Sequence, residues 1–343
     1  MFHIILVSAV LLMIPIRNNK NLSKILRSIA FWILFLFLAL RYDFGNDYQS
    51  YHLIHSSFNA GLMTWGYDDV LFRNLNLWIS NFYFFIAIIS LFYIIVIKFL
   101  IKCNLNVNLY WFSIFLLLIN PYLFLMHLSA LRQTLAICFF ILAIHFAIKK
   151  KIWMYLFFIV IAIGFHGTAI ILLPTYFVLN ESKVNKGWRI GLIIGLIVML
   201  ISPFFLNVIS ELLIHFPSHF TSYFEQGLQN SLRATLLSSA YFFFVFMNIN
   251  KLQGSEIVYG KLYLIATIIL VLGFNLSMIS RIGMYFDIFA IIAIPQILSR
   301  IQNKLEKKIW IFILIFIYIL RYYSFFMNPM WESFIHYRTI FGR

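Results

Sequence analysis

Residues 79–102 read ISNFYFFIAIISLFYIIVIKFLIK, and this stretch contains no charged residue before Lys98. An apolar helix of about 20 residues is long enough to cross the hydrocarbon core of a bilayer, which is about 30 Å thick. Similar runs recur through all 343 residues of the chain, of which 63% are hydrophobic and 11% charged. Soluble globular domains carry about 25% charged residues. The sequence therefore predicts an all-α polytopic integral membrane protein with no soluble domain.

The apolar runs predict about twelve transmembrane helices within a single membrane domain that covers residues 1–343. The first run lacks the basic region and the cleavage site of a signal peptide, so we expect it to be retained as a span. Two larger polar connections are expected, at residues 42–78 and 209–232. The predicted spans are 2–16, 28–41, 79–101, 109–127, 131–148, 152–165, 167–180, 189–208, 232–248, 262–280, 282–299 and 309–326.

The lysines predict the orientation of the chain. When the connections between spans alternate between two sides, every lysine falls on one side, which the positive-inside rule identifies as the cytoplasm. The net charge of +15 is spread over these short clusters, so it indicates membrane topology and not a nucleic-acid partner. The side without lysine carries only arginines as its basic residues: Arg41, Arg73, Arg132, Arg233, Arg281, Arg321, Arg338 and Arg343.

Arginine without lysine favours recognition of an anion, because the guanidinium group binds phosphate or carboxylate through two parallel hydrogen bonds. The alternative is that these arginines anchor helices at the level of the lipid headgroups. Arg132 shares a helix face with Gln133 in the sequence HLSALRQTLA. Arg321 is predicted to lie below the outer interface, where a charge usually faces a cavity or a partner.

The segment between Lys151 and Glu181 is long for one span and short for two. A single span would move half of the lysines to the opposite side, so we predict a hairpin that turns at GFHG, residues 164–167. Each arm of about 14 residues would rise only about 21 Å. His166 is therefore expected in a recess below the outer surface that water can reach.

Few carboxylates lie within the predicted spans. Asp287 is the only carboxylate well within a predicted span. Arg281 is its expected counter-ion, and Tyr285 lies between them in the sequence. An ion-coupled pump normally contains a relay of buried acids. The spacing of the two cysteines indicates neither a disulfide nor a metal site, and no nucleotide-binding, zinc or GxSxG motif is present. We therefore expect neither a metal nor another cofactor.

Three stretches in order resemble the EpsG family of exopolysaccharide polymerases, which are related in function to Wzy-type O-antigen polymerases. They are RYDFGNDYQSYH at residues 41–52, SALRQTLAICFFILAIHFAIKKK at residues 129–151, and FHGTAIILLP at residues 165–174. The sequence SRIGMYFD, residues 280–287, matches more loosely. Asn46 and Thr168 depart from the family pattern, in which a threonine or another small residue and a serine are expected, but both positions remain polar.

The resemblance implies a GT-C-like glycosyltransferase of the bacterial inner membrane with its active site facing the periplasm. Such an enzyme transfers a growing glycan from undecaprenyl pyrophosphate to a lipid-linked repeat unit of an O-antigen or exopolysaccharide. The attacking sugar hydroxyl needs a base, for which His166 is the first candidate and Asp47 the second. Arg132, Arg281 and Arg41 are candidates to bind the pyrophosphate. Further candidate contacts with substrate are Gln133, Tyr48, Tyr285, Asp287, Arg321 and Arg73.

Besides the lipid-linked glycans and the bilayer, the resemblance implies a chain-length regulator and a flippase as partners. Three other functions remain open. A flippase for lipid-linked oligosaccharides would place its arginines along a central cavity. A ligase or another lipid-linked glycosyltransferase would use the same type of site. An O-acetyltransferase would need a polar path or a histidine on the cytoplasmic side, and the inner connections contain no histidine.

Overall fold

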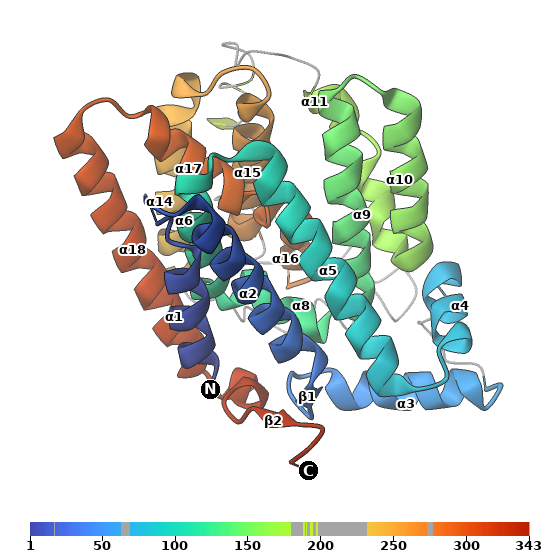
Figure 1. Ribbon diagram of the computed structural model, residues 1–343. Helices are drawn as coiled ribbons and strands as arrows, with labels where there is room; N and C mark the ends of the chain where they lie inside the picture. Colours follow the sequence, from blue (N-terminus) through green and yellow to red (C-terminus); the bar gives the residue numbers. More distant parts are fainter. Residues whose placement is uncertain are drawn as a thin grey trace. The chain divides into compact units, whose positions relative to one another are not determined.

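The computed structural model describes residues 1–16, 18–62, 69–179, 232–272 and 277–342, together with residues 188, 190, 193, 194 and 197. The described chain is almost entirely helical (Figure 1), and the sheet in this part consists of two short antiparallel strands. It divides into two compact units. The first contains Met1–Asn180 and Tyr318–Arg343, and the second contains Glu181–Ile317.

Four helices in the described ranges are long and apolar enough to cross a membrane: α2 (Lys20–Ala39), α5 (Phe82–Asn104), α9 (Leu131–Ile148) and α18 (Lys304–Phe326). Two bent helix pairs, Val107–Ile119 with Pro121–Ser129 and Arg281–Asp287 with Ala290–Arg300, bring this number to at most six. The helical membrane class is therefore confirmed, whereas twelve spans and a GT-C-like arrangement stay predictions. The expected span 189–208 falls mostly, and the expected connection 209–232 almost entirely, outside the described residues.

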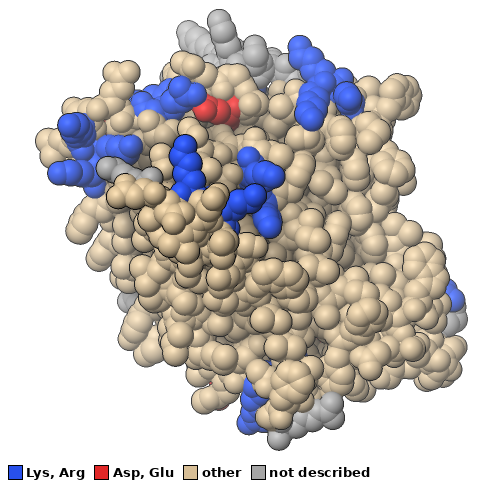
Figure 2. Space-filling model, viewed as in Figure 1, with Lys and Arg blue, Asp and Glu red and all other residues tan. Residues whose placement is uncertain are grey.

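In the first unit, α1 (Phe2–Met13) packs against α2 and α6, and α2 packs against α5. Asn19 and Asn81 begin α2 and α5, because each side chain accepts a hydrogen bond from a backbone N–H in the first turn. Most of the face seen in Figure 2 carries neither basic nor acidic side chains, as expected of a protein surrounded by lipid. After α5 follow η1 (Val107–Leu109), α6 (Tyr110–Ile119), α7 (Pro121–Phe124) and α8 (Met126–Ser129).

The predicted hairpin is present. After α9 the chain turns at Lys150, whose φ is 57°, and α10 (Ile152–Phe165) packs along α9. The chain then reverses at His166 into η2 (Gly167–Leu172) and α11 (Thr175–Leu179). The Tyr155 hydroxyl donates to the Leu172 carbonyl over 2.5 Å, which fixes the second arm against the first. His166 and the lysines before α10 therefore lie at opposite ends of α10.

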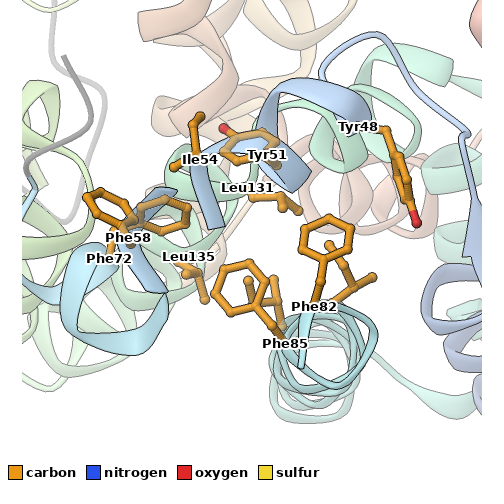
Figure 3. Close-up of a cluster of buried hydrophobic side chains, with 11 residues drawn as sticks. Tyr48, Tyr51, Ile54, Phe58, Phe72, Phe82, Phe85, Leu131 and Leu135 are labelled. Atoms are coloured by element: carbon orange, nitrogen blue, oxygen red, sulfur yellow. The ribbon is translucent and has the colours of Figure 1, made fainter. Parts of the chain in front are cut away.

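The connection 42–78 contains two helices, α3 (Tyr48–Asn59) and α4 (Val70–Trp78). Figure 1 shows α3 crosswise to α5 at the end where α5 begins. Aromatic and aliphatic side chains from α3, α4, α5 and α9 form one buried cluster, drawn in Figure 3. Its members are Tyr48, Tyr51, Ile54, Phe58, Phe72, Phe82, Phe85, Ile86, Ile89, Leu131 and Leu135. This cluster holds the polar connection against the spans.

The end of the chain returns to the segment that follows α2. Strand β1 (Arg41–Tyr42) pairs with β2 (Arg338–Thr339), with Arg41 opposite Thr339. Before β2, η4 (Pro329–Phe334) contacts the loop after β1, where the Gly45 N–H donates to the Ser333 carbonyl over 3.3 Å. The C-terminal segment is therefore joined through backbone hydrogen bonds to the segment that follows α2.

The described part of the second unit contains α14 (Leu232–Asn248), η3 (Ile249–Lys251), α15 (Glu256–Leu272), α16 (Ser277–Asp287), α17 (Ala290–Arg300) and the first part of α18. Ion pairs between described residues connect its elements. Lys251 donates to Glu306 over 2.5 Å, and Arg300 donates to Glu256 over 2.8 Å. Lys261 is buried within α15, and its ammonium lies 4.9 Å from the centre of the Trp188 ring.

Candidate functional site

Asp69 binds two separate segments of the first unit. Its Oδ2 accepts a hydrogen bond from Arg132 Nη1 over 2.7 Å, and its Oδ1 accepts one from the backbone N–H of Gly167 over 2.9 Å. The Nδ1 atom of His166 lies 3.8 Å from Asp69 Oδ2, which is beyond hydrogen-bond length but close enough for electrostatic attraction when the imidazole is protonated. We call Asp69, Arg132 and His166 the outer triad.

The ends of helices position the outer triad. Asp69 directly precedes α4, Arg132 is the second residue of α9, and His166 is the extended residue between α10 and η2. Residues next to these three belong to the cluster of Figure 3 or pack against it: Leu131 and Phe72 are buried, and Phe165 is partly buried. The polar groups therefore rest on a rigid apolar base, as a preorganised site requires.

Gly164 allows α4 to approach α10. A Cβ atom at this position would lie 2.7 Å from side-chain carbons of Leu71, a distance that real Cβ contacts do not show. Leu71 is the second residue of α4, so the missing side chain of Gly164 lets Asp69 reach Gly167. The GFHG sequence thus supplies both the turn and the space for the helix that carries the acid.

The outer triad is partly open to water. The exposed fractions of the side chains are 15% for Asp69, 17% for Arg132 and 16% for His166. Burial tends to raise the pKa of Asp69, but nearby His166, the charge of Arg132 and the N–H of Gly167 outweigh burial and hold that pKa below its usual value. Asp69 is therefore a carboxylate near neutral pH, and it compensates the cation beside it.

Arg41 has a different environment. It is only 2% exposed, and it donates to two carbonyl oxygens at helix ends, Leu38 over 2.9 Å and Leu128 over 3.4 Å. Burial lowers its pKa to about 10, and the same cause raises the pKa of neighbouring Tyr48 to about 12. Among the residues that the structure describes, Arg41 forms no ion pair. A cation at helix C-termini stabilises the carbonyl ends.

The other candidates of the first unit lie around these two centres. Gln133 is buried beside Arg132, and Arg73 is exposed one turn after Asp69 on α4. Asp47 is exposed at the start of α3. Arg321 lies over the ring of Tyr122, with 4.8 Å between its guanidinium carbon and the ring centre.

Three candidates belong to the second unit and lie on α16. Arg281 is exposed, whereas Tyr285 and Asp287 are buried. Of the predicted site, the structure thus brings together Arg132 and His166. The three candidates on α16 belong to a separate compact unit.

Sequence patterns did not single out Asp69, which holds the other two residues of the outer triad. The available signal was its position directly before the amphipathic helix VLFRNLNLW, because an aspartate there begins a helix and lies near the positive end of its dipole. No group of three or more histidine, cysteine or acidic residues suited to a metal ion occurs in the ranges that the structure describes.

Residues 24–339 match the model of the EpsG family, which covers nearly the whole chain. The chain therefore belongs to the EpsG family. No curated protein and no solved structure matches it. The family indicates a membrane protein with a role like that of polysaccharide polymerases.

Proposed function

We propose that this member of the EpsG family is a polysaccharide polymerase of the bacterial inner membrane whose active site faces the periplasm. Its substrates would be a growing glycan on undecaprenyl pyrophosphate and a lipid-linked repeat unit of an exopolysaccharide or O-antigen. The observation that carries the proposal is the outer triad, in which Asp69 holds Arg132 next to His166. His166 lies at the end of α10 opposite the lysines, which supports a site on the outer side of the membrane.

In the proposed reaction, a hydroxyl oxygen of the acceptor sugar attacks the anomeric carbon of the donor glycan. A C–O bond to that carbon forms, and the bond from the anomeric carbon to the pyrophosphate oxygen breaks. Undecaprenyl pyrophosphate leaves with the bonding electron pair, and the hydroxyl proton passes to the base. All atoms of both substrates are thereby accounted for without a further reactant.

The residues of the outer triad have different tasks in this reaction. Nδ1 of His166 faces Asp69, which leaves Nε2 to take the hydroxyl proton as general base. Arg132 stabilises the negative charge that develops on the leaving pyrophosphate. Asp69 orients both side chains and does not touch the substrate. Asp47 stays the second candidate for the base.

Arg41, Tyr48, Arg73, Gln133 and Arg321 are proposed to line or support the substrate site, and Arg281, Tyr285 and Asp287 of α16 stay candidate contacts with the substrate. We expect no cofactor, because arginine side chains supply the positive charge that the leaving group requires. We also propose that the chain has a twelve-span GT-C-like architecture. A chain-length regulator and a flippase are its proposed partners.

A gene deletion in the native strain tests the function. Loss of long polysaccharide chains with retention of a single capped repeat supports a polymerase. Loss of all repeats would instead indicate a flippase, and unchanged chain length with a missing acetyl group would indicate an acyltransferase. Retained polymer that fails to reach its final lipid would indicate a ligase.

Variants in the deletion strain test the site. Arg132→Ala and His166→Ala should both give the single-repeat pattern at wild-type membrane levels. Arg132→Lys should also fail, because lysine cannot form two parallel hydrogen bonds with phosphate. Two variants are matched controls that should retain full ladders: Arg27→Ala, in the first half of α2, and His145→Ala, in the last turn of α9. Full ladders from both triad variants would refute the assignment.

A further inference from the structure

The loop after β1 and the end of the chain enclose a polar depression in the first unit, with a volume of about 330 Å³. Five side chains line it, and all five are polar: Asp43, Glu332, Ser333, His336 and Arg338. We call it the C-terminal depression. Its volume is at the lower end of the range for small-molecule sites, roughly 300–1,000 Å³.

The walls of the C-terminal depression are joined to each other. Tyr42, next to Asp43, pairs with Arg338 in the two-stranded sheet. Asn46 donates to the Met330 carbonyl over 3.0 Å, and its side-chain oxygen accepts a hydrogen bond from Ser333. These contacts join residues that are far apart in sequence, and they hold the two walls together. The depression is therefore preformed, and a ligand would not have to order it.

Asp43 is held toward the other wall in an unusual conformation. Its φ is 47°, a left-handed value that aspartate tolerates better than most residues. The side-chain amide of Gln49 donates to its Oδ1 over 2.7 Å, which fixes the carboxylate. Asp43 is exposed, so its other oxygen atom, Oδ2, can be reached by a ligand.

The lining identifies the chemical class of the ligand. Two carboxylates accept hydrogen bonds, whereas the guanidinium and hydroxyl groups donate them. Vicinal sugar hydroxyls both donate and accept, so they match such a mixed set. Two carboxylates disfavour a phosphate or pyrophosphate, and a polar lining disfavours a lipid tail.

We propose that the C-terminal depression binds a sugar residue of the glycan, away from the pyrophosphate. This inference rests on the proposed function. The loop that carries Asp43 continues to Gly45, where an added Cβ would lie 3.1 Å from the Ser129 Oγ atom. Ser129 is three residues before Arg132, so the depression and the outer triad lie on connected segments of one unit. The depression thus holds sugar hydroxyls while the outer triad acts on the anomeric carbon.

Direct binding to the full-length protein in nanodiscs tests the proposal. The probe is the repeat-unit oligosaccharide that mild acid releases from its undecaprenyl pyrophosphate carrier, so it carries neither lipid nor pyrophosphate. Isothermal titration should give binding that Asp43→Asn and Glu332→Gln each weaken about tenfold, the effect of losing one charge-assisted hydrogen bond of about 1.4 kcal/mol. Asparagine keeps the left-handed conformation accessible, so the thermal midpoint should not change.

Matched measurements separate this proposal from the proposed function. Glu306→Gln, an acid of the second unit, should bind like the wild type. Arg132→Ala should also bind the probe like the wild type while losing polymerisation. Ladders that persist in Arg132→Ala, with binding that still depends on Glu332, would refute the catalytic assignment and support the sugar site. Equal binding by all variants, or displacement of the probe by inorganic pyrophosphate, would overturn the sugar site.

Discussion

Replacement of Asp69 by asparagine should disable the site without unfolding it. The amide keeps an oxygen that accepts the Gly167 N–H, but it removes the negative charge from the 2.7 Å contact with Arg132. A hydrogen bond between charged groups contributes about 1.5–3 kcal/mol. Since the two side chains are 15% and 17% exposed, water weakens this contact only in part. We therefore expect a coupling energy of about 2 kcal/mol, or roughly thirtyfold in rate.

A double-mutant cycle measures this coupling. Initial polymerisation rates are recorded in nanodiscs with lipid-linked repeat units for the wild type, Asp69→Asn, Arg132→Gln and the double variant. The single variants should each be at least roughly thirtyfold slower, and the double variant should be no slower than the slower single variant, because both changes disrupt one contact. The matched cycle on Lys251 and Glu306, an ion pair of the second unit, should leave the rate unchanged.

Two results would refute this reasoning. Rate losses that multiply in the double variant would show that Asp69 and Arg132 act independently. A wild-type rate in Asp69→Asn would show that the contact does not position Arg132 for the reaction. The thermal midpoint of each variant is measured in parallel, so that a folding defect is recognised as such.

The remaining predictions concern stability and packing. The folded-state pKa of Asp69 is lowered, so its contribution to stability is complete above the unfolded pKa of about 3.9 and is lost as pH falls through the folded value. The difference in thermal midpoint between wild type and Asp69→Asn should therefore shrink as the pH falls from neutral to below the unfolded pKa, and a constant difference would contradict this. Gly164→Ala should lower the free energy of unfolding by about 1–3 kcal/mol by overpacking against Leu71, and it should reduce polymerisation. Adding Leu71→Ala should restore polymerisation. Failure of this rescue would exclude the packing explanation. Arg41→Met should lower the thermal midpoint, because it leaves buried carbonyl groups without their donor. Arg132→Ala should affect mainly the rate. Equal midpoints for both variants would contradict the structural role of Arg41.

Local sequence patterns predicted several elements of the first unit. The apolar run at residues 79–101 forms most of α5, which begins and ends three residues later. The run at 131–148 forms α9 with the predicted boundaries. The hairpin followed from the lysine distribution together with the length of the segment, and the turn lies at His166 as predicted. Hydropathy predicted less well where the chain bends. The run 109–127 is broken at Asn120 into helices that differ by 89° in direction, because Pro121 begins a new helix there.

The connection 42–78 shows why the site was predicted only in part. Its polar residues marked it as functional, but Asp47 was chosen because it lies within a recognisable motif, and Asp69 was not. The contacts that distinguish Asp69 reach across 63 residues to Arg132 and 98 residues to Gly167. Such separations have no local periodicity, and they result from the aromatic cluster of α3, α4, α5 and α9.

The arginines of the outer side illustrate the same limit in electrostatic terms. Arg41 and Arg132 have the same charge and lie on the same predicted side, yet one is buried against carbonyl groups and the other is paired with a carboxylate near water. A buried guanidinium that donates to helix ends is fixed by the backbone, so it contributes mainly to the fold. The guanidinium group of Arg132 is partly exposed beside a carboxylate, so an incoming phosphate can reach it. Burial and partner type, and not the residue pattern alone, thus decide which arginine is suited to stabilise a leaving pyrophosphate, and they favour Arg132.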